Sequence, residues 1–293
     1  MKSTWLTFCV VAAIALLGTT EPKSDEPGNA PASAADPMSG KKPGDVRDDN
    51  GLKMKLVWCP PRNFTMGSPK SEKDRFENED QVEVTLTKGF WLGKYEVTQS
   101  EWKQVMATEF WKGANLTKEG ADFPATWVNW PDATEFCRKL TEQERNKGRM
   151  PDGWEYTLPT EAQWECACRA GTKTKFSFGD DESKLGEYAW FVVNTSIAGE
   201  GYAHQMGRKK PNPWGLCDMH GNVWEWCRDY YAEKLPGGRD PEVTEKAYAR
   251  VLRGGSWRSD VALCRSAYRW PTPGARDNFI GFRVALSSVQ PVK

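Results

Sequence analysis

Histidine is almost absent from this chain: only His204 and His220 occur among its 293 residues. Two histidines cannot build a three-histidine metal site, and neither lies in the spaced Cys and His pattern of a zinc finger. Charge of one sign is not in excess either, because 40 Lys and Arg residues balance 40 Asp and Glu residues. A chain without a basic excess has nothing to follow a phosphate backbone, so nucleic-acid binding is not expected.

Long apolar runs are also missing, with one short exception at the N-terminus. Met1, Lys2 and Ser3 give a positive start, and the apolar run from Trp5 to Leu17 is too brief to span a bilayer comfortably. We expect residues 1–20 to be a signal peptide, with an uncleaved signal anchor as the alternative. The protein is then exported, to the periplasm, the extracellular space or the cell surface.

Large apolar residues are rare from residue 21 to residue 50, where Pro, Ser, Ala, Asp and Lys dominate. Such a segment cannot offset its ordering entropy by burial, so it is predicted to be a disordered linker. Residues 51–290 have the composition of a globular domain without a second linker or an internal repeat. Their short apolar runs, broken by Gly, Pro, Asn and Asp, predict one irregular α+β domain.

Two helices have clear N-terminal signals. Asn129 can cap a helix that runs to about Asn146, and Thr160 with Gln163 has the spacing of a capping box. Gly171 is the expected stop of the second helix. Strands are expected at residues 55–58, 82–86, 90–95, 250–252 and 282–285. The 15 Trp residues are interpreted as interior packing, because no basic run accompanies them as it would on a nucleic-acid stacking surface.

Four separated motifs carry a resemblance to a known family. They are the ranges Leu158–Glu165, Gly215–Trp226, Arg250–Trp257 and Ile280–Arg283. Together they resemble the formylglycine-generating enzyme family, which carries the sulfatase-modifying factor domain, and the chain is similar to its exported bacterial members. The resemblance implies an irregular, loop-rich fold related to the C-type-lectin-like fold. It also implies an oxidase that converts a sulfatase cysteine to formylglycine with copper and oxygen.

The family places two copper-binding cysteines after the Gly-Gly-Ser motif as Cys-x4-Cys, and here at least one is missing. On an ungapped alignment, Ser259 stands in place of the first cysteine and Cys264 stands at the second. On a gapped alignment, which the distance from Cys264 to Gly281 favours, Cys264 matches a later cysteine whose disulfide partner corresponds to Cys168. Because two thiolates form the soft site that Cu(I) prefers, losing one argues against the oxidase.

The resemblance also implies a calcium site. Its ligands would be the carboxylates of Asp218 and Glu225 and the backbone carbonyls of Gly221 and Val223. These are the hard oxygen ligands that Ca²⁺ prefers. In the alternative interpretation Glu225 is a buried carboxylate paired with an arginine, either Arg253 or Arg283, and Asp218 is a turn residue.

Ser256 and Trp224 match positions near the family's active cleft. No motif places a histidine to activate Ser256, so a turn serine after two glycines is favoured over a nucleophile. We hypothesise a binding or repurposed member of the family, whose cleft face holds a protein, peptide or glycan.

The alternative hypothesis is an active copper oxidase. Cys264 would then hold the metal with one further ligand, for which Cys217, Cys227 and His220 are the candidates. The family's iron branch uses three histidines, and the two present here do not supply them.

Overall fold

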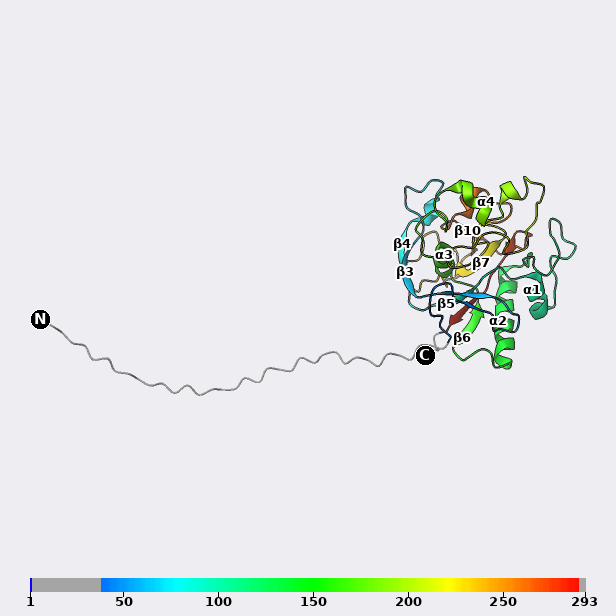
Figure 1. Ribbon diagram of the computed structural model, residues 1–293, viewed down its shortest axis with the longest axis horizontal. Helices are drawn as coiled ribbons and strands as arrows, with labels where there is room; N and C mark the ends of the chain where they lie inside the picture. The colour runs from blue at the N-terminus through cyan, green and yellow to red at the C-terminus, as the bar shows by residue number, and fades with distance from the viewer. Residues whose placement is uncertain (2–37, 290–293) are drawn as a thin grey trace. The chain divides into compact units, whose positions relative to one another are not determined.

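The computed structural model describes residues 38–289 together with Met1 (Figure 1). The predicted signal peptide, beyond Met1, and the predicted linker as far as residue 37 lie outside the described residues. Within the described part of the chain, no helix is both long and apolar enough to cross a membrane.

Residues 38–50 belong to the folded domain rather than to the predicted linker. The strand β1 (Val46–Arg47) pairs antiparallel with β2 (Leu56–Cys59). The Trp91 indole donates a hydrogen bond of 2.7 Å to the Met38 carbonyl, and Asn50 is buried. A segment poor in apolar residues is therefore held by backbone pairing and by the side chains of its neighbours. Amino-acid composition alone does not predict this kind of stabilisation.

Four α-helices occur in the described residues, and the two predicted from their capping signals are confirmed. They are α1 (Gln99–Met106), α2 (Trp130–Asn146), α3 (Glu161–Arg169) and α4 (Leu185–Tyr188). Asn129 caps α2, and Thr160 caps α3 by accepting from the Gln163 amide at 3.1 Å. The helix α3 ends at Arg169, and the next two residues, Ala170 and Gly171, both have positive φ. The prediction missed α1, which begins with a capping box between Thr98 and Glu101.

Twelve strands form three sheets in the described residues. The first sheet has the order β1, β2, β5 (Phe90–Gly93), β12 (Ala285–Ser288) and β6 (Trp154–Thr157). The second has the order β10 (Arg269–Thr272), β9 (Arg250–Arg253), β7 (Trp224–Tyr230) and β11 (Ile280–Gly281). The third has the order β3 (Arg62–Met66), β4 (Val82–Leu86) and β8 (Gly238–Arg239). The strand predicted at residues 282–285 is misplaced. β11 of the second sheet ends at Gly281 and β12 of the first sheet begins at Ala285, so residues 282–284 connect the two strands.

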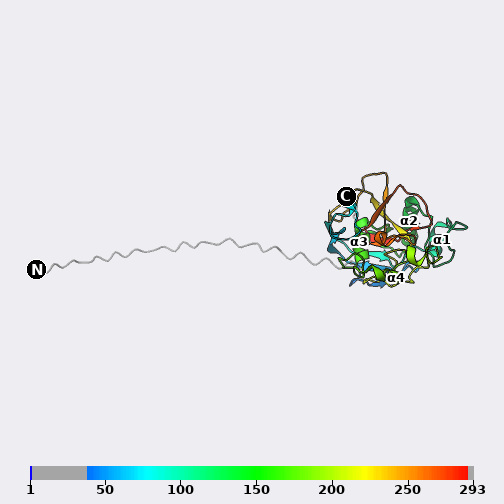
Figure 2. The same cartoon turned by 90° about the horizontal axis from the view of Figure 1, so that it is seen from above.

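The helices lie on different sides of the domain. Figures 1 and 2 show α1 and α2 side by side at one edge, whereas α3 lies nearer the opposite side. Between α1 and α2, Trp102 stacks on Phe136 with ring centroids 5.6 Å apart. Trp102, Trp164 and Trp226 are fully buried, and the Trp226 indole donates to the Val128 carbonyl at 2.8 Å. These contacts support the interpretation of the tryptophans as interior packing.

Buried ion pairs tie α3 to the second sheet. Arg253 of β9 pairs with Glu165 of α3, and Arg269 of β10 pairs with Glu161 of α3 at 2.6 Å. All four side chains are fully buried. Breaking such a pair leaves an uncompensated charge in the interior, so the pairs fix the relative position of helix and sheet. They form the rigid frame beside the candidate site.

Candidate functional site

The second sheet borders a pocket of about 350 Å³. Its lining comes from the start of β7, the turn after β9, the short 3-10 helix η4 (Val261–Cys264), the residues around β10 and the segment before β11. The eight lining residues are Trp224, Arg258, Ser259, Leu263, Tyr268, Trp270, Asp277 and Phe279. The pocket thus contains two residues that the sequence singled out, Trp224 and Ser259.

Four of the eight lining residues are aromatic. The Trp224 ring centroid lies 5.7 Å from that of Tyr268 and 5.3 Å from that of Trp270, and Trp270 lies 6.1 Å from Phe279. Four adjoining rings give a large apolar surface that loses little side-chain entropy when a ligand binds. The wall is therefore suited to an apolar or aromatic group.

The turn that carries Ser259 depends on two glycines. Gly254 and Gly255 have φ values of 98° and 77°, and a Cβ atom on Gly255 would lie 2.8 Å from the Cys264 sulfur. Beyond them, the Ser256 carbonyl accepts from the Ser259 amide at 2.9 Å, and the Ser259 hydroxyl accepts from the Ser256 amide at 2.9 Å. Ser256 is fully buried in this turn. Its geometry is that of the turn serine favoured from sequence.

The two positions of the ungapped copper alignment face different surroundings. Ser259 lines the pocket, whereas Cys264 is fully buried in a cluster with Phe176, Leu185 and Phe191. Burial raises the pKa of the Cys264 thiol far above its ordinary value, which opposes the thiolate that copper binds. The lining of this pocket contains no cysteine or histidine. Cys217 and Cys227, proposed as alternative ligands, are also buried, and burial raises the pKa of both thiols.

Cys168 and Cys264 both approach His220. The Cys168 sulfur lies 3.8 Å from His220 Nε2, and His220 Nδ1 lies 2.9 Å from the Cys264 carbonyl oxygen. The Ser177 amide donates to His220 Nε2 at 3.1 Å, and burial lowers the pKa of the imidazole to about 4. His220 is thus a neutral structural residue in this geometry, with both ring nitrogens engaged. Cys168 and Cys264 are free thiols here, and their disulfide stays a prediction.

Two buried carboxylates near the predicted calcium site have unsatisfied oxygens. Asp218 accepts from the Gly207 amide at 2.7 Å through Oδ2, but its Oδ1 has no partner. Glu96 accepts from the Asn222 side chain at 3.1 Å through Oε1, and its Oε2 has no partner. Burial raises the pKa of Asp218 to about 6 and that of Glu96 well above its usual range, and the Asp218 charge adds to the effect on Glu96. Orphaned carboxylate oxygens are hard ligands of the kind that Ca²⁺ prefers, and no group of three or more His, Cys, Asp or Glu side chains that could hold a metal occurs in the described residues.

Glu225, predicted as a calcium ligand, forms the buried arginine pair considered as the alternative, and its calcium role stays a prediction. Its two oxygens each accept from the Arg283 guanidinium at 2.6 Å, and Oε2 also accepts from the Trp164 indole at 2.7 Å. Because these bonds use both oxygens, Glu96 is the better partner for Asp218 in a cation site. The sequence offered one signal for Glu96, a carboxylate directly after the strand predicted at residues 90–95; the observed strand β5 ends at Gly93.

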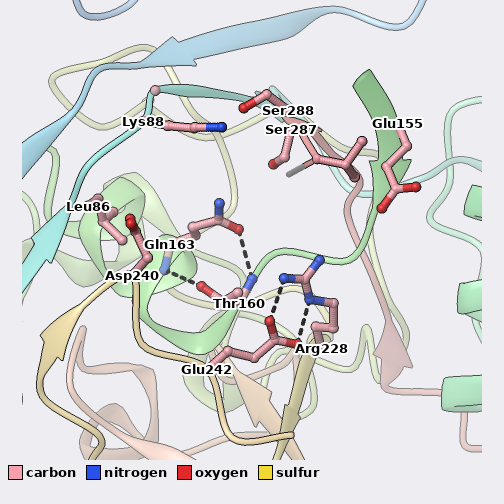
Figure 3. Close-up of a pocket in the computed structure, with 12 residues that line it drawn as sticks. Leu86, Lys88, Glu155, Thr160, Gln163, Arg228, Asp240, Glu242, Ser287 and Ser288 are labelled. Carbon is pink, nitrogen blue, oxygen red and sulfur yellow. Dashed lines mark hydrogen bonds and ion pairs between the residues drawn. The ribbon is translucent and has the colours of Figure 1, made fainter. Parts of the chain in front are cut away.

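A second pocket, of about 260 Å³, lies beside the N-terminus of α3 (Figure 3). Among its polar groups, Arg228 pairs with Glu242, and Thr160 bonds to Gln163 in the helix cap. Asp240 accepts from the Thr87 amide at 2.7 Å. None of the site residues predicted from the sequence lines this pocket, so the aromatic pocket remains the candidate site.

Several residues of the aromatic pocket were not identified from the sequence. Arg258, Tyr268, Trp270, Asp277 and Phe279 come from three segments that meet only in the folded chain. Phe279 directly precedes the motif at 280–283, and this position was its one available signal. The other residues lie in segments without a distinctive pattern.

The loop-rich α+β fold, the Gly-Gly-Ser turn and the cleft beside Trp224 define a domain of the sulfatase-modifying factor class. Residues 44–288 match the family described as the sulfatase-modifying factor enzyme 1-like domain. The chain belongs to this family, as the motifs predicted, and the predicted fold is confirmed.

Curated relatives include both enzymes and proteins with other names. A chaperone protein, LppX of Paenibacillus barcinonensis, is 29% identical over 69% of this chain and 80% of its own length. The formylglycine-generating enzyme of Streptomyces coelicolor is 32% identical over 55% of this chain and 52% of its own length. The inactive C-alpha-formylglycine-generating enzyme 2 of Mus musculus is 29% identical over 65% of this chain and 59% of its own. The match therefore spans about half of the Streptomyces enzyme.

Solved structures agree with this assignment. PvdO from Pseudomonas aeruginosa is 27% identical with a TM-score of 0.73, covering 85% of this chain and all of its own, 100%. Treponema denticola variable protein 1 is 29% identical with a TM-score of 0.68, covering 79% of this chain and 94% of its own. Membership of the family leaves oxidase and binding roles both open, because the relatives include each kind.

Proposed function

We propose that this chain is an exported binding member of the family, which holds a segment of a partner protein in the aromatic pocket. The observation that carries the proposal is the lining of that pocket. At the position where the ungapped alignment places a copper thiolate, Ser259 offers a hydroxyl, and aromatic rings make up most of the remaining wall. A hydroxyl bonded to Ser256 at 3.1 Å is a poor ligand for soft Cu(I).

An exposed apolar side chain beside the pocket supports a macromolecular ligand. Of the seven exposed large apolar residues of the described chain, Phe76 contacts the pocket wall, and Leu116, Val193 and Ile197 lie on segments hydrogen-bonded to Ser259 or Asn278. Phe76 contacts Tyr268, with ring centroids 5.0 Å apart. The Val192 amide donates to the Ser259 carbonyl at 3.1 Å, and the Asn278 side chain donates to the Asn115 carbonyl at 3.2 Å. An exposed aromatic ring against the pocket wall enlarges the apolar surface that a protein ligand would cover.

The proposal includes a structural cation. Glu96 Oε2 and Asp218 Oδ1 would hold Ca²⁺ by charge, and the cation would neutralise two carboxylates that otherwise lie unpaired in the interior. Its role there is to stabilise the loop at residues 215–223 that precedes Trp224, not to take part in a reaction. Export supports this assignment, since an exported protein meets abundant calcium.

The names of the relatives support a binding role by analogy. One is called a chaperone and one an inactive enzyme, so the family accommodates members whose names do not denote an oxidase. A short extended segment with an aromatic side chain is the ligand that the pocket fits best. A glycan that stacks on Trp270 is the second class of ligand that the rings could hold.

The first experiment measures binding of a capped peptide, acetyl-Gly-Gly-Phe-Gly-Gly-amide, to the purified full chain by NMR titration. We expect binding that weakens at least fivefold in Trp270→Ala, which removes one wall of the pocket. Tyr248→Ala is the matched control, because this aromatic residue is 76% exposed and is absent from the pocket lining. Equal affinity in both variants, or binding of a hexose but not of the peptide, would overturn the peptide proposal.

The second experiment tests the oxidase directly. Cu(I) is titrated into the reduced full chain, and a sulfatase-type Cys-x-Pro-x-Arg peptide is then incubated with the protein, copper and oxygen. We expect no tight one-to-one copper complex and no formylglycine by mass spectrometry. Conversion of the peptide, lost in Cys264→Ser, would replace the binding role by the oxidase.

A further inference from the structure

Two charges of opposite sign line the aromatic pocket without an ion-pair partner in the described chain. Arg258 is exposed, and its guanidinium lies 4.8 Å from the centroid of the Phe279 ring. Asp277 is half-buried, and its Oδ1 accepts from the Asn278 amide at 2.7 Å. No salt bridge between these two residues, or from either to another described residue, is formed.

Two other arginines in the same region, unlike Arg258, do form ion pairs. Arg265 pairs with Glu79 at 2.6 Å, and Arg276 pairs with Asp132 at 2.7 Å. The neighbouring acid Asp260, two residues from Arg258, makes no ion pair with it within the described residues. The unpaired Arg258 and Asp277 are therefore the charges that face a ligand in the pocket.

The backbone at both residues is held in place by the surrounding chain. The Arg258 amide donates to the Ser256 hydroxyl at 3.4 Å, so the residue follows the rigid turn after β9. The Asp277 carbonyl accepts from the Trp127 amide at 2.9 Å, and Trp127 has a φ of 60°. A bulky residue adopts this left-handed conformation only at an energetic cost. Trp127 is thus a positioning residue that fixes the segment carrying Asp277.

We propose that the pocket selects a dipolar segment, in which an aromatic residue is flanked by one acidic and one basic residue. The inference rests on the proposed binding function and deepens it. The rings of Trp224, Trp270 and Phe279 take the aromatic side chain, Arg258 takes the acidic neighbour, and Asp277 takes the basic one. Because the two residues lie at fixed places in the backbone, their charges also set the direction in which the segment lies.

The test compares three capped heptapeptides with Gly-Gly at each end and Glu-Phe-Lys, Lys-Phe-Glu or Gln-Phe-Gln at the centre. Affinities for the full chain are measured by NMR titration at low salt. We expect one of the two charged orders to bind about tenfold more tightly than the neutral peptide, since two partly exposed ion pairs contribute about two- to fivefold each. The advantage should shrink at high salt.

The decisive variant is the double charge reversal Arg258→Glu with Asp277→Lys, which should invert the preferred order of the two charged peptides. The single neutralisations Arg258→Gln and Asp277→Asn keep the local backbone bonds and should each reduce the preference about threefold. If thermal unfolding shows that the double variant does not fold, the two single variants test the same prediction.

The two proposals fail in different ways. Equal binding of all three peptides, weakened by Trp270→Ala, would overturn the dipolar selectivity and leave the binding function standing. A preference that survives the charge reversal and both neutralisations would also overturn the selectivity. Failure of every peptide to bind would overturn the binding function itself.

Discussion

Asp218→Asn should stabilise the metal-free protein, which is the opposite of the usual effect of changing a buried residue. In the wild-type chain, Asp218 Oδ1 and Glu96 Oε2 are buried acceptors without a donor. An asparagine can keep the bond from the Gly207 amide and present its NH₂ group to Glu96. Asp218 has a φ of 61°, a left-handed conformation that asparagine adopts readily. The substitution therefore fits both the backbone and the unsatisfied acceptors.

The size of the effect follows from the cost of an unsatisfied buried acceptor, which is about 1–3 kcal/mol. Relieving the orphaned oxygens should raise the free energy of unfolding by about 2 kcal/mol, or roughly 4–8 °C in melting temperature for a domain of this size. The assay is calorimetric melting in the presence of a chelator. Asp152→Asn, an exposed residue, is the control and should change nothing.

Adding calcium should reverse the order of the two proteins. The wild-type pair carries two negative charges toward the cation, whereas the variant carries one, so the wild type should gain the larger shift. Asp218→Asn melting below the wild type in chelator would refute the account of the orphaned oxygens. A wild type that calcium does not stabilise would refute the cation site.

Three other changes test the frame and the pocket. Arg283→Met leaves Glu225 charged and unpaired in the interior, so the free energy of unfolding in urea should fall by about 3–5 kcal/mol; a loss below about 1 kcal/mol would contradict the pairing. Burial raises the pKa of Asp229 to about 7, so the folded chain keeps a proton there that the unfolded chain loses above about pH 4. Its contribution to stability should therefore fall between about pH 4 and 7, by on the order of 4 kcal/mol at most, and Asp229→Asn should flatten that slope in denaturation curves; an unchanged slope would contradict it. Ser259→Cys should bind Cu(I) no more tightly than a single thiol does, because Cys264 is buried in another cluster; a tight one-to-one complex would show that the two sulfurs converge.

Local signals in the sequence predicted local structure well. The caps of α2 and α3 could be predicted because the side chains of Asn129 and Thr160 bond to amides three residues away. The cap of α1 had the same form in Thr98 and Glu101 but was overlooked, since the following eight-residue helix has a short apolar face. The position of β12 could not be predicted, because which sheet a strand joins depends on partners far away in the chain.

The candidate site was only partly visible for the same reason. Trp224 and Ser259 stand in or near motifs, whereas Trp270 and Asp277 reach the pocket through pairings with β9 and with Trp127. The buried pair of Glu96 and Asp218 joins residues more than a hundred positions apart. That one oxygen of each carboxylate lacks a hydrogen-bond donor is visible only in the folded structure.

The motifs that identify the family contain residues of buried ion pairs more than residues of the aromatic pocket. Arg253 and Glu165 come from two of the motifs and pair with each other in the interior, and Arg283 and Glu225 come from the other two and do the same. The pocket stands apart from these pairs, and the Ser259 hydroxyl bonds only to Ser256 among the described residues. A thiolate at position 259 can therefore be absent without disturbing any buried ion pair. Strong motif agreement and a serine at position 259 are thus compatible in one stable chain, so the motifs alone do not decide between the oxidase and the binding role.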